Sequence, residues 1–381
     1  MLRPAVTLRK DLARSIRSGH PWVYRDALAG RPALVDGTLV EVRAKDGKRL
    51  ATGFWDSESP IAVRILARDK FEALEPLLRE RLDAALSRRL ERIEPSLTNA
   101  FRWVHGEADA LPGVHIDVYA DVASVRFDGR GARATYRSLA GELQGTQGWS
   151  IERVLDRDAR GAAGSVEVRE NGLRFAVDLA HGQKGGLFLD QRENRAEIGR
   201  RAAGRRVLNL FGYTGAFSLY AARGGALRTD TVDQAKPAML AAEQNFALNG
   251  LPTDRAHAGF HARDAFEFLP EAARAKKRWD LVICDPPSFA KSRRALPAAR
   301  AAYRRLYALA MAVVEPGGLF CPASCSSHFP RDEFLAAVSD AARGSGRRFT
   351  AELVTGAGFD HPVVPAFPEG DYLKFAIGTL V

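Results

Sequence analysis

The stretch VLNLFGYTGAFSLYAARGG, residues 207–225, decides the fold class of this chain. It opens with a short apolar run that is typical of a buried strand, and it continues with a run of apolar residues at helical spacing. Between the two lies a turn with Gly212 and Gly215, which lets the backbone approach a ligand closely. The turn is not a GxGxxG motif, so taken alone it is a weak indication of a binding site.

The alternation of strand and helix extends from about residue 191 onward. RTDTVD (228–233) reads as a strand, and the helical run AKPAMLAAEQNFALNG (235–250) follows it. WDLVICD (279–285) and GGLFCPAS (317–324) are two further strands with helical segments between them. Alternation of this kind predicts an α/β fold with a doubly wound, mostly parallel sheet, whose ligands bind at the carboxyl ends of the strands.

Two aspartates follow predicted strands at this same edge. Asp233 ends the strand after the glycine turn, about 20 residues on, where a carboxylate accepts both ribose hydroxyls of a nucleoside. Asp264, in ARDAF, ends a third strand, where an acid or amide group meets an adenine amino group. The alternative for each aspartate is a helix N-cap. Three strand-end elements in register favour the nucleoside site.

The order of these elements resembles the fold of S-adenosylmethionine-dependent methyltransferases, and the fourth strand end strengthens the resemblance. There the chain reads Asp285-Pro286-Pro287-Ser288-Phe289. Two prolines neither extend a helix nor pair fully in a sheet, so they present the aspartate rigidly. Methyltransferases that act on planar amino groups carry an aromatic residue in the fourth place. Here Ser288 takes that place, which argues against simple exocyclic-amine chemistry.

The chain has three cysteines, Cys284, Cys321 and Cys325. They form neither a disulfide framework nor a paired CxxC metal site, so we expect no metal and a reducing, cytoplasmic setting. Cys284 and Cys321 lie inside predicted strands, and we expect both in the core. Cys325, in PASCSSHF (322–329), falls at the end of the fifth strand, beside the fourth.

Cys325 and Asp285 are therefore expected to meet across the cofactor pocket. This arrangement suits methylation of C5 of a pyrimidine, because that carbon is a poor nucleophile by itself. A thiolate that adds to C6 makes C5 enamine-like and able to accept a methyl group. Asp285 near N3 holds or protonates the ring as charge develops, and for that role we expect its pKa to be raised.

The chain as a whole resembles the bacterial 23S ribosomal RNA cytosine-C5 methyltransferase family, which has an N-terminal PUA domain. Any one of the matching motifs is unspecific, but together they cover nearly the whole chain. They are GHPWVY (19–24), GEADALPGVHIDVY (106–119), QKGGLFLDQRENR (183–195), NLFGYTGAFS (209–218), CDPPSFAKS (284–292), SCSS (324–327) and DHPVVPAFPEGDYLKF (360–375).

The resemblance implies a PUA β-barrel at residues 1–72, a central α+β connecting domain at 73–190, and a class I, Rossmann-like methyltransferase domain at 191–381. It implies S-adenosyl-L-methionine as cofactor, Cys325 as nucleophile, and 23S ribosomal RNA as partner. Together with the motifs, it predicts that the cofactor contacts Phe188, Asp190, Gln191, Asn209, Phe211, Gly212, Tyr213, Thr214, Gly215, Asp233, Asp264, Asp285 and Pro286, and that the substrate contacts Pro287, Phe289, Lys184, Arg192 and Lys291.

Two residues depart from the family pattern. Pro322 stands within the strand that leads to Cys325, where it indicates a shifted strand end or an exposed edge. Gly185 stands where the family often carries threonine, so a local hydrogen bond is missing. His328 and His361 are candidates for the base that removes the C5 proton, with a structural role as the alternative for both.

The composition agrees with an RNA partner. The formal net charge is +10, and the segment 291–305 holds six basic residues and no acid. Lys184, Arg192 and Arg195 are candidates to face phosphates, with plain solvent exposure as the alternative. No apolar run approaches the roughly 20 residues of a membrane span, and the basic N-terminus lacks the apolar region of a signal peptide. A homodimer is compatible with the sequence.

Three other functions compete with the cytosine reaction. Related RNA methyltransferases with a DPP-x-F motif methylate guanine nitrogens without a nucleophile, and they lack a cysteine at the place of Cys325. An RNA-binding assembly factor with a vestigial pocket is the second, although the set Gly212, Asp233, Asp264 and Asp285 is intact. A nicotinamide oxidoreductase is disfavoured, because GxGxxG is absent.

Overall fold

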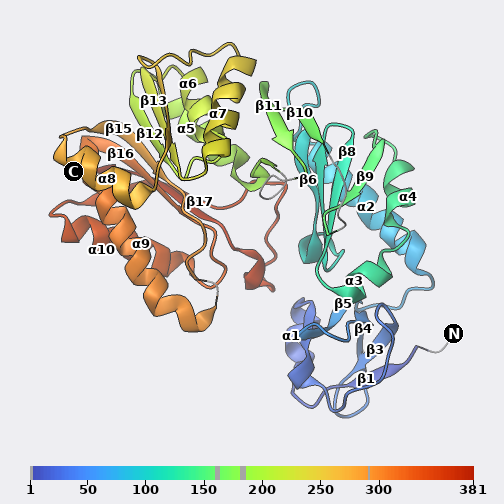
Figure 1. Ribbon diagram of the computed structural model, residues 1–381. Coiled ribbons are helices and arrows are strands. Elements are labelled where there is room, and N and C mark those ends of the chain that lie inside the picture. The colour runs from blue at the N-terminus through green and yellow to red at the C-terminus, as the bar shows by residue number, and fades with distance from the viewer. Residues whose placement is uncertain (1–2, 159–163, 181–185, 291) are drawn as a thin grey trace. The chain divides into compact units, whose positions relative to one another are not determined.

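The computed structural model describes residues 3–158, 164–180, 186–290 and 292–381 (Figure 1). Contacts divide the chain into two compact units, Met1–Gly164 with Phe359–Gly370, and Ser165–Gly358 with Asp371–Val381. Within the described ranges, none of the helices combines the length and the apolar character that a membrane span needs.

The first unit begins with a small five-stranded sheet. Alternate residues of its strands, such as Val40 and Val42, are buried and form one core with Ile16 of the first helix. The strands pair in the order β1 (Ala5–Thr7), β3 (Leu39–Arg43), β4 (Arg49–Trp55), β5 (Ile61–Ala67) and β2 (Trp22–Tyr24), and the helix is α1 (Ala13–Ser18).

A second sheet of four strands follows in the same unit. Its apolar residues, among them Trp103 and Ile116, pack with Leu82 of the long helix α2 in a core of their own. The elements are α2 (Leu74–Leu90), α3 (Arg130–Thr135) and α4 (Leu139–Gln144), with strands β6 (Ala100–His105), β7 (Val114–Tyr119), β8 (Val122–Phe127) and β9 (Arg153–Asp156) in that order.

A late segment of the chain, Phe359–Gly370, belongs to this first unit. Arg89 donates to the carbonyl oxygen of Asp360 at 2.8 Å, and the backbone N–H of Arg102 donates to Asp360 Oδ2 at 2.9 Å. The ring of Phe367 lies 4.6 Å from that of Trp22, centre to centre. These contacts hold the segment against residues more than 250 positions earlier in the chain.

The second unit begins with the antiparallel hairpin of β10 (Ser165–Glu170) and β11 (Leu173–Asp178). Asn245 Oδ1 accepts from the N–H of Ala176 at 3.0 Å, so the hairpin packs against helix α7 (Lys236–Leu248). The predicted domain boundary at residue 190 thus falls after a hairpin that shares a compact unit with the large sheet.

The large sheet has seven strands in the order β14 (Ala258–Ala262), β13 (Arg228–Asp233), β12 (Arg206–Leu210), β15 (Trp279–Cys284), β16 (Val314–Ser324), β18 (Lys374–Leu380) and β17 (Phe349–Thr355). The first five are parallel, whereas β18 runs antiparallel to both of its neighbours. This is the doubly wound, mostly parallel sheet that the strand–helix alternation predicts. The carboxyl ends of the five parallel strands therefore meet along one edge.

Helices cover both faces of this sheet (Figure 1). Residues that alternate along β12 explain why: Val207 packs with α5 and α6, whereas Leu208 packs with α8, α9 and α10. The helices are α5 (Arg192–Arg201), α6 (Ala216–Arg223), α8 (Ala265–Arg274), α9 (Leu296–Met311) and α10 (Arg331–Gly344).

The prediction for Pro322 is wrong on both of its alternatives. β16 lies between β15 and β18, so Pro322 is buried in a central strand and not at an exposed edge. The ladder to β18 omits Cys321 and Pro322 and resumes with Ala323 opposite Phe375 in the same register. A proline lacks the N–H that such a ladder needs, but here the gap spans only two residues and the strand still ends at Ser324.

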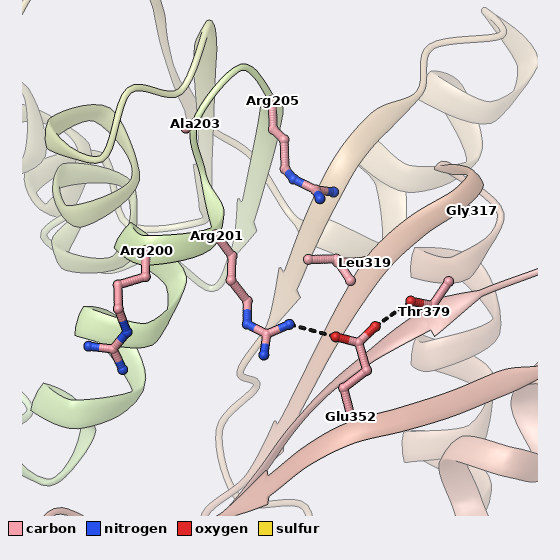
Figure 2. A pocket seen from close by; sticks show the side chains of 8 residues that line it. All are labelled: Arg200, Arg201, Ala203, Arg205, Gly317, Leu319, Glu352 and Thr379. Carbon is pink, nitrogen blue, oxygen red and sulfur yellow. Dashed lines mark hydrogen bonds and ion pairs between the residues drawn. The ribbon is translucent and has the colours of Figure 1, made fainter.

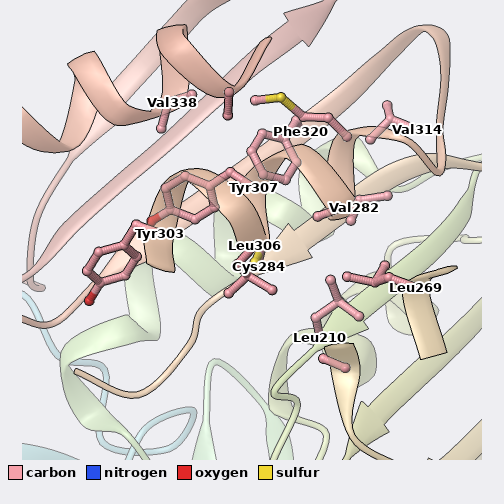
Figure 3. Packing of buried hydrophobic residues seen from close by; sticks show 14 of the residues in the cluster. Leu210, Leu269, Val282, Cys284, Tyr303, Leu306, Tyr307, Val314, Phe320 and Val338 are labelled. Carbon is pink, nitrogen blue, oxygen red and sulfur yellow. The ribbon is translucent and has the colours of Figure 1, made fainter. Parts of the chain in front are cut away.

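Cys284 and Cys321 both lie in the core, as predicted. Figure 3 shows Cys284 among Leu210, Leu306 and Tyr307, on the face that α9 covers. Cys321 points to the other face and packs in a separate cluster. Burial raises the pKa of both thiols, and the carboxylate of Asp285 raises that of Cys284 further.

Candidate active site

A cavity of about 450 Å³ lies at the carboxyl edge of the seven-stranded sheet. Each of the five parallel strands contributes to it, because the chain turns away at the end of every strand and leaves its first loop residues facing inward. Of the residues predicted for the site, those that line the cavity are Phe188, Asp190, Gln191, Phe211, Gly212, Tyr213, Thr214, Asp233, Asp264, Asp285, Pro286, Pro287, Phe289 and Cys325.

The turn after β12 is a strained one. Phe211 and Tyr213 adopt positive φ angles of 57° and 46°, a conformation that costs free energy for residues other than glycine and that recurs at binding sites. A Cβ atom on Gly212 would meet Asn209 Nδ2 at 2.9 Å, and one on Gly215 would meet Ala242 Cβ at 2.8 Å. Both glycines are thus required by packing within the protein, a reason that differs from the close ligand approach predicted for them.

The two aspartates that follow β13 and β14 are held by backbone N–H groups. Asp233 Oδ2 accepts from Tyr213 at 3.0 Å, which ties the strained turn to the neighbouring strand end. Asp264 Oδ1 accepts from Phe266 at 2.6 Å and is the N-cap of α8, so the alternative that the sequence left open applies to it. Both residues nevertheless line the cavity.

The segment before α5 reaches the cavity through a chain of amide groups. Gln191 Nε2 donates to Asp285 Oδ2 at 2.8 Å, and Gln191 Oε1 accepts from Asn194 Nδ2 at 2.6 Å. Tyr372 donates its hydroxyl hydrogen to Asp190 Oδ2 at 2.6 Å. The amides of Asn194 and Gln191 thus hold the Asp285 carboxylate from the side of α5, and Tyr372 holds Asp190; the sequence indicated neither Asn194 nor Tyr372.

Arg195 is a sequence candidate for facing phosphates, with solvent exposure as the alternative; it lines the cavity, but its guanidinium has partners inside the protein. It forms two hydrogen bonds to Glu170, at 2.9 and 2.6 Å, and it donates to the carbonyl oxygen of Phe188 at 2.8 Å. Only 1% of Arg195 is exposed. The buried pair therefore holds the Phe188 loop in place, and removal of one partner alone would leave an uncompensated buried charge.

The loops of Asp285 and Cys325 share a network of hydroxyl groups. Ser326 Oγ lies 2.7 Å from Ser288 Oγ and 2.9 Å from the hydroxyl of Tyr303, which also accepts from Ser324 Oγ at 2.9 Å. Phe289 packs against Tyr303 at 4.8 Å between ring centres. One tyrosine of α9 thus braces both loops. Hydroxyl groups on a helix and on two serine-containing turns carry no sequence signal that they will meet.

Three predicted residues have other positions, and two lie outside the described residues. Asn209 is buried and donates to Ser218 Oγ at 3.1 Å, below the turn, and Gly215 precedes α6 without lining the cavity. Arg192 is 3% exposed and pairs with Glu193 at 3.2 Å, also outside the cavity lining. Lys184 and Lys291 lie outside the described residues.

The two histidines proposed as bases are not in the cavity lining. His361 belongs to the first unit, where its Nδ1 lies 2.9 Å from Asp360 Oδ1 and its ring contacts that of His105. His328 is exposed in the turn after Cys325. Among the residues that the structure describes, no group of His, Cys, Asp or Glu is suited to a metal ion.

The donor set of the cavity fits S-adenosylmethionine. Asp233 offers acceptors to ribose hydroxyls, Phe211 and Phe266 offer apolar surface to a purine ring, and the carboxylates of Asp190 and Asp285 suit a ligand with a cationic sulfonium and an ammonium group. The packing constraint on Gly212 preserves the turn that borders this space.

Comparisons with known proteins agree with this geometry. Residues 160–349 match the S-adenosylmethionine-dependent methyltransferase family, and residues 6–68 match the PUA-like domain. The crystal structure of SMU.776, described as a methyltransferase and solved with SAH, aligns over 100% of both chains at a TM-score of 0.86 and 23% identity. A SAM-dependent methyltransferase from Streptococcus mutans aligns over 99% of this chain at a TM-score of 0.84 and 22% identity, covering 100% of that chain. These likenesses confirm the class I methyltransferase fold with an N-terminal PUA-like domain.

Curated relatives extend the match to nearly the full length. Ribosomal RNA large subunit methyltransferase I of Shewanella denitrificans is 35% identical over 390 residues, which cover 97% of each chain. The protein of the same name from Shewanella amazonensis is 36% identical over 391 residues, again with 97% of each chain covered. This chain, with its S-adenosylmethionine-dependent methyltransferase domain, therefore belongs to the ribosomal RNA large subunit methyltransferase I family.

Proposed function

We propose that this protein methylates C5 of a cytosine in large-subunit (23S) ribosomal RNA through a covalent bond between Cys325 and C6 of the base. The observation that carries the proposal is the pairing of Cys325 and Asp285 in one cavity, at the ends of the adjacent strands β16 and β15. The names of the full-length relatives support large-subunit ribosomal RNA as the substrate.

The proposed reaction uses the residues of this cavity in sequence. S-adenosylmethionine, when bound, supplies the electrophilic methyl group. Cys325 as a thiolate forms a bond to C6, and the displaced electron pair makes C5 nucleophilic. Asp285, held by Gln191, stands beside the ring and stabilises it at N3 as charge develops. After C5 has gained the methyl group, a base removes the C5 proton, the C5–C6 double bond re-forms and the sulfur leaves.

The base must leave its stack to reach Cys325 and the methyl donor together. Pro287 and Phe289, which line the cavity beside Asp285, are proposed to contact the extruded cytosine. Lys184 and Lys291 remain our candidates for contacts with the RNA backbone, which the net charge of +10 favours, whereas the burial of Arg192 argues against such a contact for that residue.

The proposal also assigns a role to each domain and a cellular location to the protein. We propose that residues 1–72 help to hold the RNA, that 73–190 connect, and that 191–381 carry out the reaction. The three free thiols agree with a cytoplasmic protein. A homodimer remains a proposal for which solution measurements are the test.

The experiment compares Cys325→Ser with Cys321→Ser, a matched change at a buried cysteine in the strand that leads to Cys325. Ribosomal RNA from a deletion strain that carries either variant is digested to nucleosides and analysed by mass spectrometry. We expect 5-methylcytosine to return with Cys321→Ser and not with Cys325→Ser.

Two results would overturn the proposal. Retained turnover in Cys325→Ser with a methylated guanine as product would favour the nucleophile-independent reaction on guanine nitrogen. A chain that binds no S-adenosylmethionine by calorimetry would favour a non-catalytic assembly factor. Trapping of a covalent adduct with RNA that contains 5-fluorocytosine would support the cysteine mechanism, because fluorine at C5 prevents release of the sulfur.

A further inference from the structure

Lys374, the first residue of β18, is unusual because it is a buried lysine. Only 1% of it is exposed, and it lies in β18 between the buried residues Leu373 and Phe375. Lysine is almost never fully buried unless its charge is compensated. In the register of the two strands Lys374 stands opposite Ser324, the residue before Cys325.

The ammonium group of Lys374 binds the turn that carries the candidate nucleophile. Nζ donates to the carbonyl oxygen of Ser326 at 2.6 Å and to that of Tyr372 at 2.9 Å. Ser326 is the residue directly after Cys325, so the lysine holds the turn from one side while Tyr303 and Ser288 hold its hydroxyl from the other. Within the described part of the chain, Lys374 forms no ion pair.

The surroundings of Lys374 leave its charge poorly compensated. The pKa of Lys374 is lowered to about 8: burial is the main cause and Arg331 on α10 adds to it, against the attraction of Asp371 and of the Cys325 thiolate. Asp371 is itself shared, because Arg331 donates to its Oδ2 at 3.4 Å. On α9 the neighbouring groups are the hydroxyls of Tyr303 and Tyr307, and burial raises the pKa of both.

The ammonium of Lys374 binds the carbonyl oxygen of the residue that follows Cys325, and a nearby positive charge favours a thiol in its anionic form. Lys374 does not line the cavity, so it can influence a bound substrate only through the residues that it contacts. Removing the charge therefore changes the ionisation of Cys325 without removing a ligand contact.

We propose that Lys374 is the positioning residue that holds the Ser324–Ser327 turn and stabilises the thiolate form of Cys325. This inference rests on the proposed function for its use in catalysis, since only a nucleophilic cysteine needs a thiolate. The stabilisation of the thiolate itself is a property of the protein that is measurable without RNA or cofactor.

The test is the pH dependence of alkylation of Cys325 by iodoacetamide in the full-length protein, followed by peptide mass spectrometry. The variants are Lys374→Met, which keeps the length of the side chain and removes its charge, and Lys374→Arg, which keeps the charge. Lys277→Met, a change at an exposed lysine, is the matched control. We expect the midpoint of the alkylation profile to rise by about one pH unit in Lys374→Met, which slows alkylation roughly tenfold near neutral pH. Lys374→Arg should restore part of the shift, and Lys277→Met should leave the midpoint unchanged.

An unchanged midpoint in Lys374→Met would overturn the inference. Lys374→Met should fold, because a thioether costs less to bury than an ammonium. The wild-type protein gives a second measure that needs no variant: a midpoint at or above about 8.5, the ordinary pKa of a cysteine thiol, would also overturn it.

The outcomes separate this inference from the proposed function. A shifted alkylation profile together with full methylation by Cys325→Ser would leave the thiolate inference standing while the cytosine mechanism falls. Loss of methylation in Cys325→Ser with no alkylation shift in Lys374→Met would leave the mechanism standing and overturn only the role of Lys374.

Discussion

At the amino ends of β12 and β16 the large sheet carries a pocket of about 370 Å³ lined by Arg200, Arg201 and Arg205, whereas the carboxyl ends of the same strands border the cavity of about 450 Å³ with its aspartates. Figure 2 shows the partner of one of these arginines: Arg201 donates to Glu352 at 2.6 Å, and Glu352 also accepts from Thr379. Arg200 and Arg201 thus have carboxylate partners, whereas Arg205 donates to the carbonyl oxygen of Asp280 at 3.5 Å.

At the carboxyl ends the aspartates have a different kind of partner. Asp233 and Asp264 accept from backbone N–H groups, and Asp285 accepts from the neutral amide of Gln191. Backbone N–H groups orient the carboxylates of Asp233 and Asp264 without cancelling their charge, so the negative potential of these two aspartates remains directed at whatever enters the cavity. One end of the sheet thus uses its charges for stability and the other keeps them for a ligand.

The difference between the two ends of the sheet is tested most directly by the same change, aspartate to asparagine, made separately at each end of β15. Asp285→Asn removes the carboxylate at the carboxyl end, and we expect the methyl-transfer rate to fall by about 100- to 10,000-fold with little change in folding. Asp280→Asn, at the amino end, loses hydrogen bonds from Arg206 at 2.8 to 3.0 Å, and we expect about 1 kcal/mol of lost stability with normal turnover. Transfer of a labelled methyl group to ribosomal RNA measures the first effect, and urea unfolding measures the second. Equal losses of activity in the two variants would contradict the distinction.

Asp230, deeper in β13, extends the comparison to stability. It is 4% exposed and binds His261, Arg228 and Trp279 at 2.8 to 3.0 Å. Burial alone would raise the pKa of Asp230, but these hydrogen bonds outweigh it and lower the pKa well below its usual range. We expect Asp230→Asn to cost about 2 to 3 kcal/mol of unfolding free energy, because it weakens the charge-assisted hydrogen bonds of a buried carboxylate.

The pH dependence of that stability has a definite sign. A carboxylate with a lowered folded-state pKa stabilises the protein fully above its ordinary pKa near 4, and the stabilisation is lost as the pH falls toward the lower folded-state value. The midpoint temperature of thermal unfolding should therefore fall less steeply between pH 7 and pH 3 in Asp230→Asn than in the wild type. Parallel curves for the two proteins would show that Asp230 is not the group responsible.

Asp233→Asn tests whether the carboxyl end keeps its charge for the cofactor. A carboxylate that accepts from ribose hydroxyls contributes about 1.5 to 3 kcal/mol, so the affinity for S-adenosylmethionine should weaken roughly 10- to 100-fold. Calorimetric titration gives the dissociation constant directly. Asp254→Asn, at an exposed aspartate outside the cavity lining, is the control and should bind as the wild type does. An unchanged affinity in Asp233→Asn would place the ribose elsewhere.

The sequence predicts the large sheet and its functional edge well, because both depend on local patterns. Strand and helix alternate at clear periods from residue 207 onward, and the prolines after Asp285 mark a strand end by covalent geometry alone. The position of Cys325 follows from the strand order, which such folds restrict strongly.

What the sequence could not predict depends on distant partners. Phe359–Gly370 packs in the first unit through Arg89 and Arg102, and nothing in this proline-containing segment indicates contacts with residues so far away in the chain. Lys374 gives no signal either, since a single lysine in a strand normally marks an exposed position. The prediction for Pro322 was wrong for the same reason. Its place in the sheet depends on the ladder to β18, which omits Pro322 and resumes at Ala323.

The smallest expected effect belongs to the amino end. Glu352→Gln removes one partner of Arg201, which keeps Glu197 at 2.6 Å. Because Glu352 is exposed and the pair is screened by water, the loss should be at most about 1 kcal/mol, and added salt should shrink it further. Methyl transfer should stay at the wild-type rate, because Glu352 pairs with Arg201 at the amino end of the sheet and does not line the cavity at the carboxyl end. A clear loss of activity in Glu352→Gln with unchanged unfolding would mean that the arginines at this end contact the RNA, and the two ends of the sheet would then share one function.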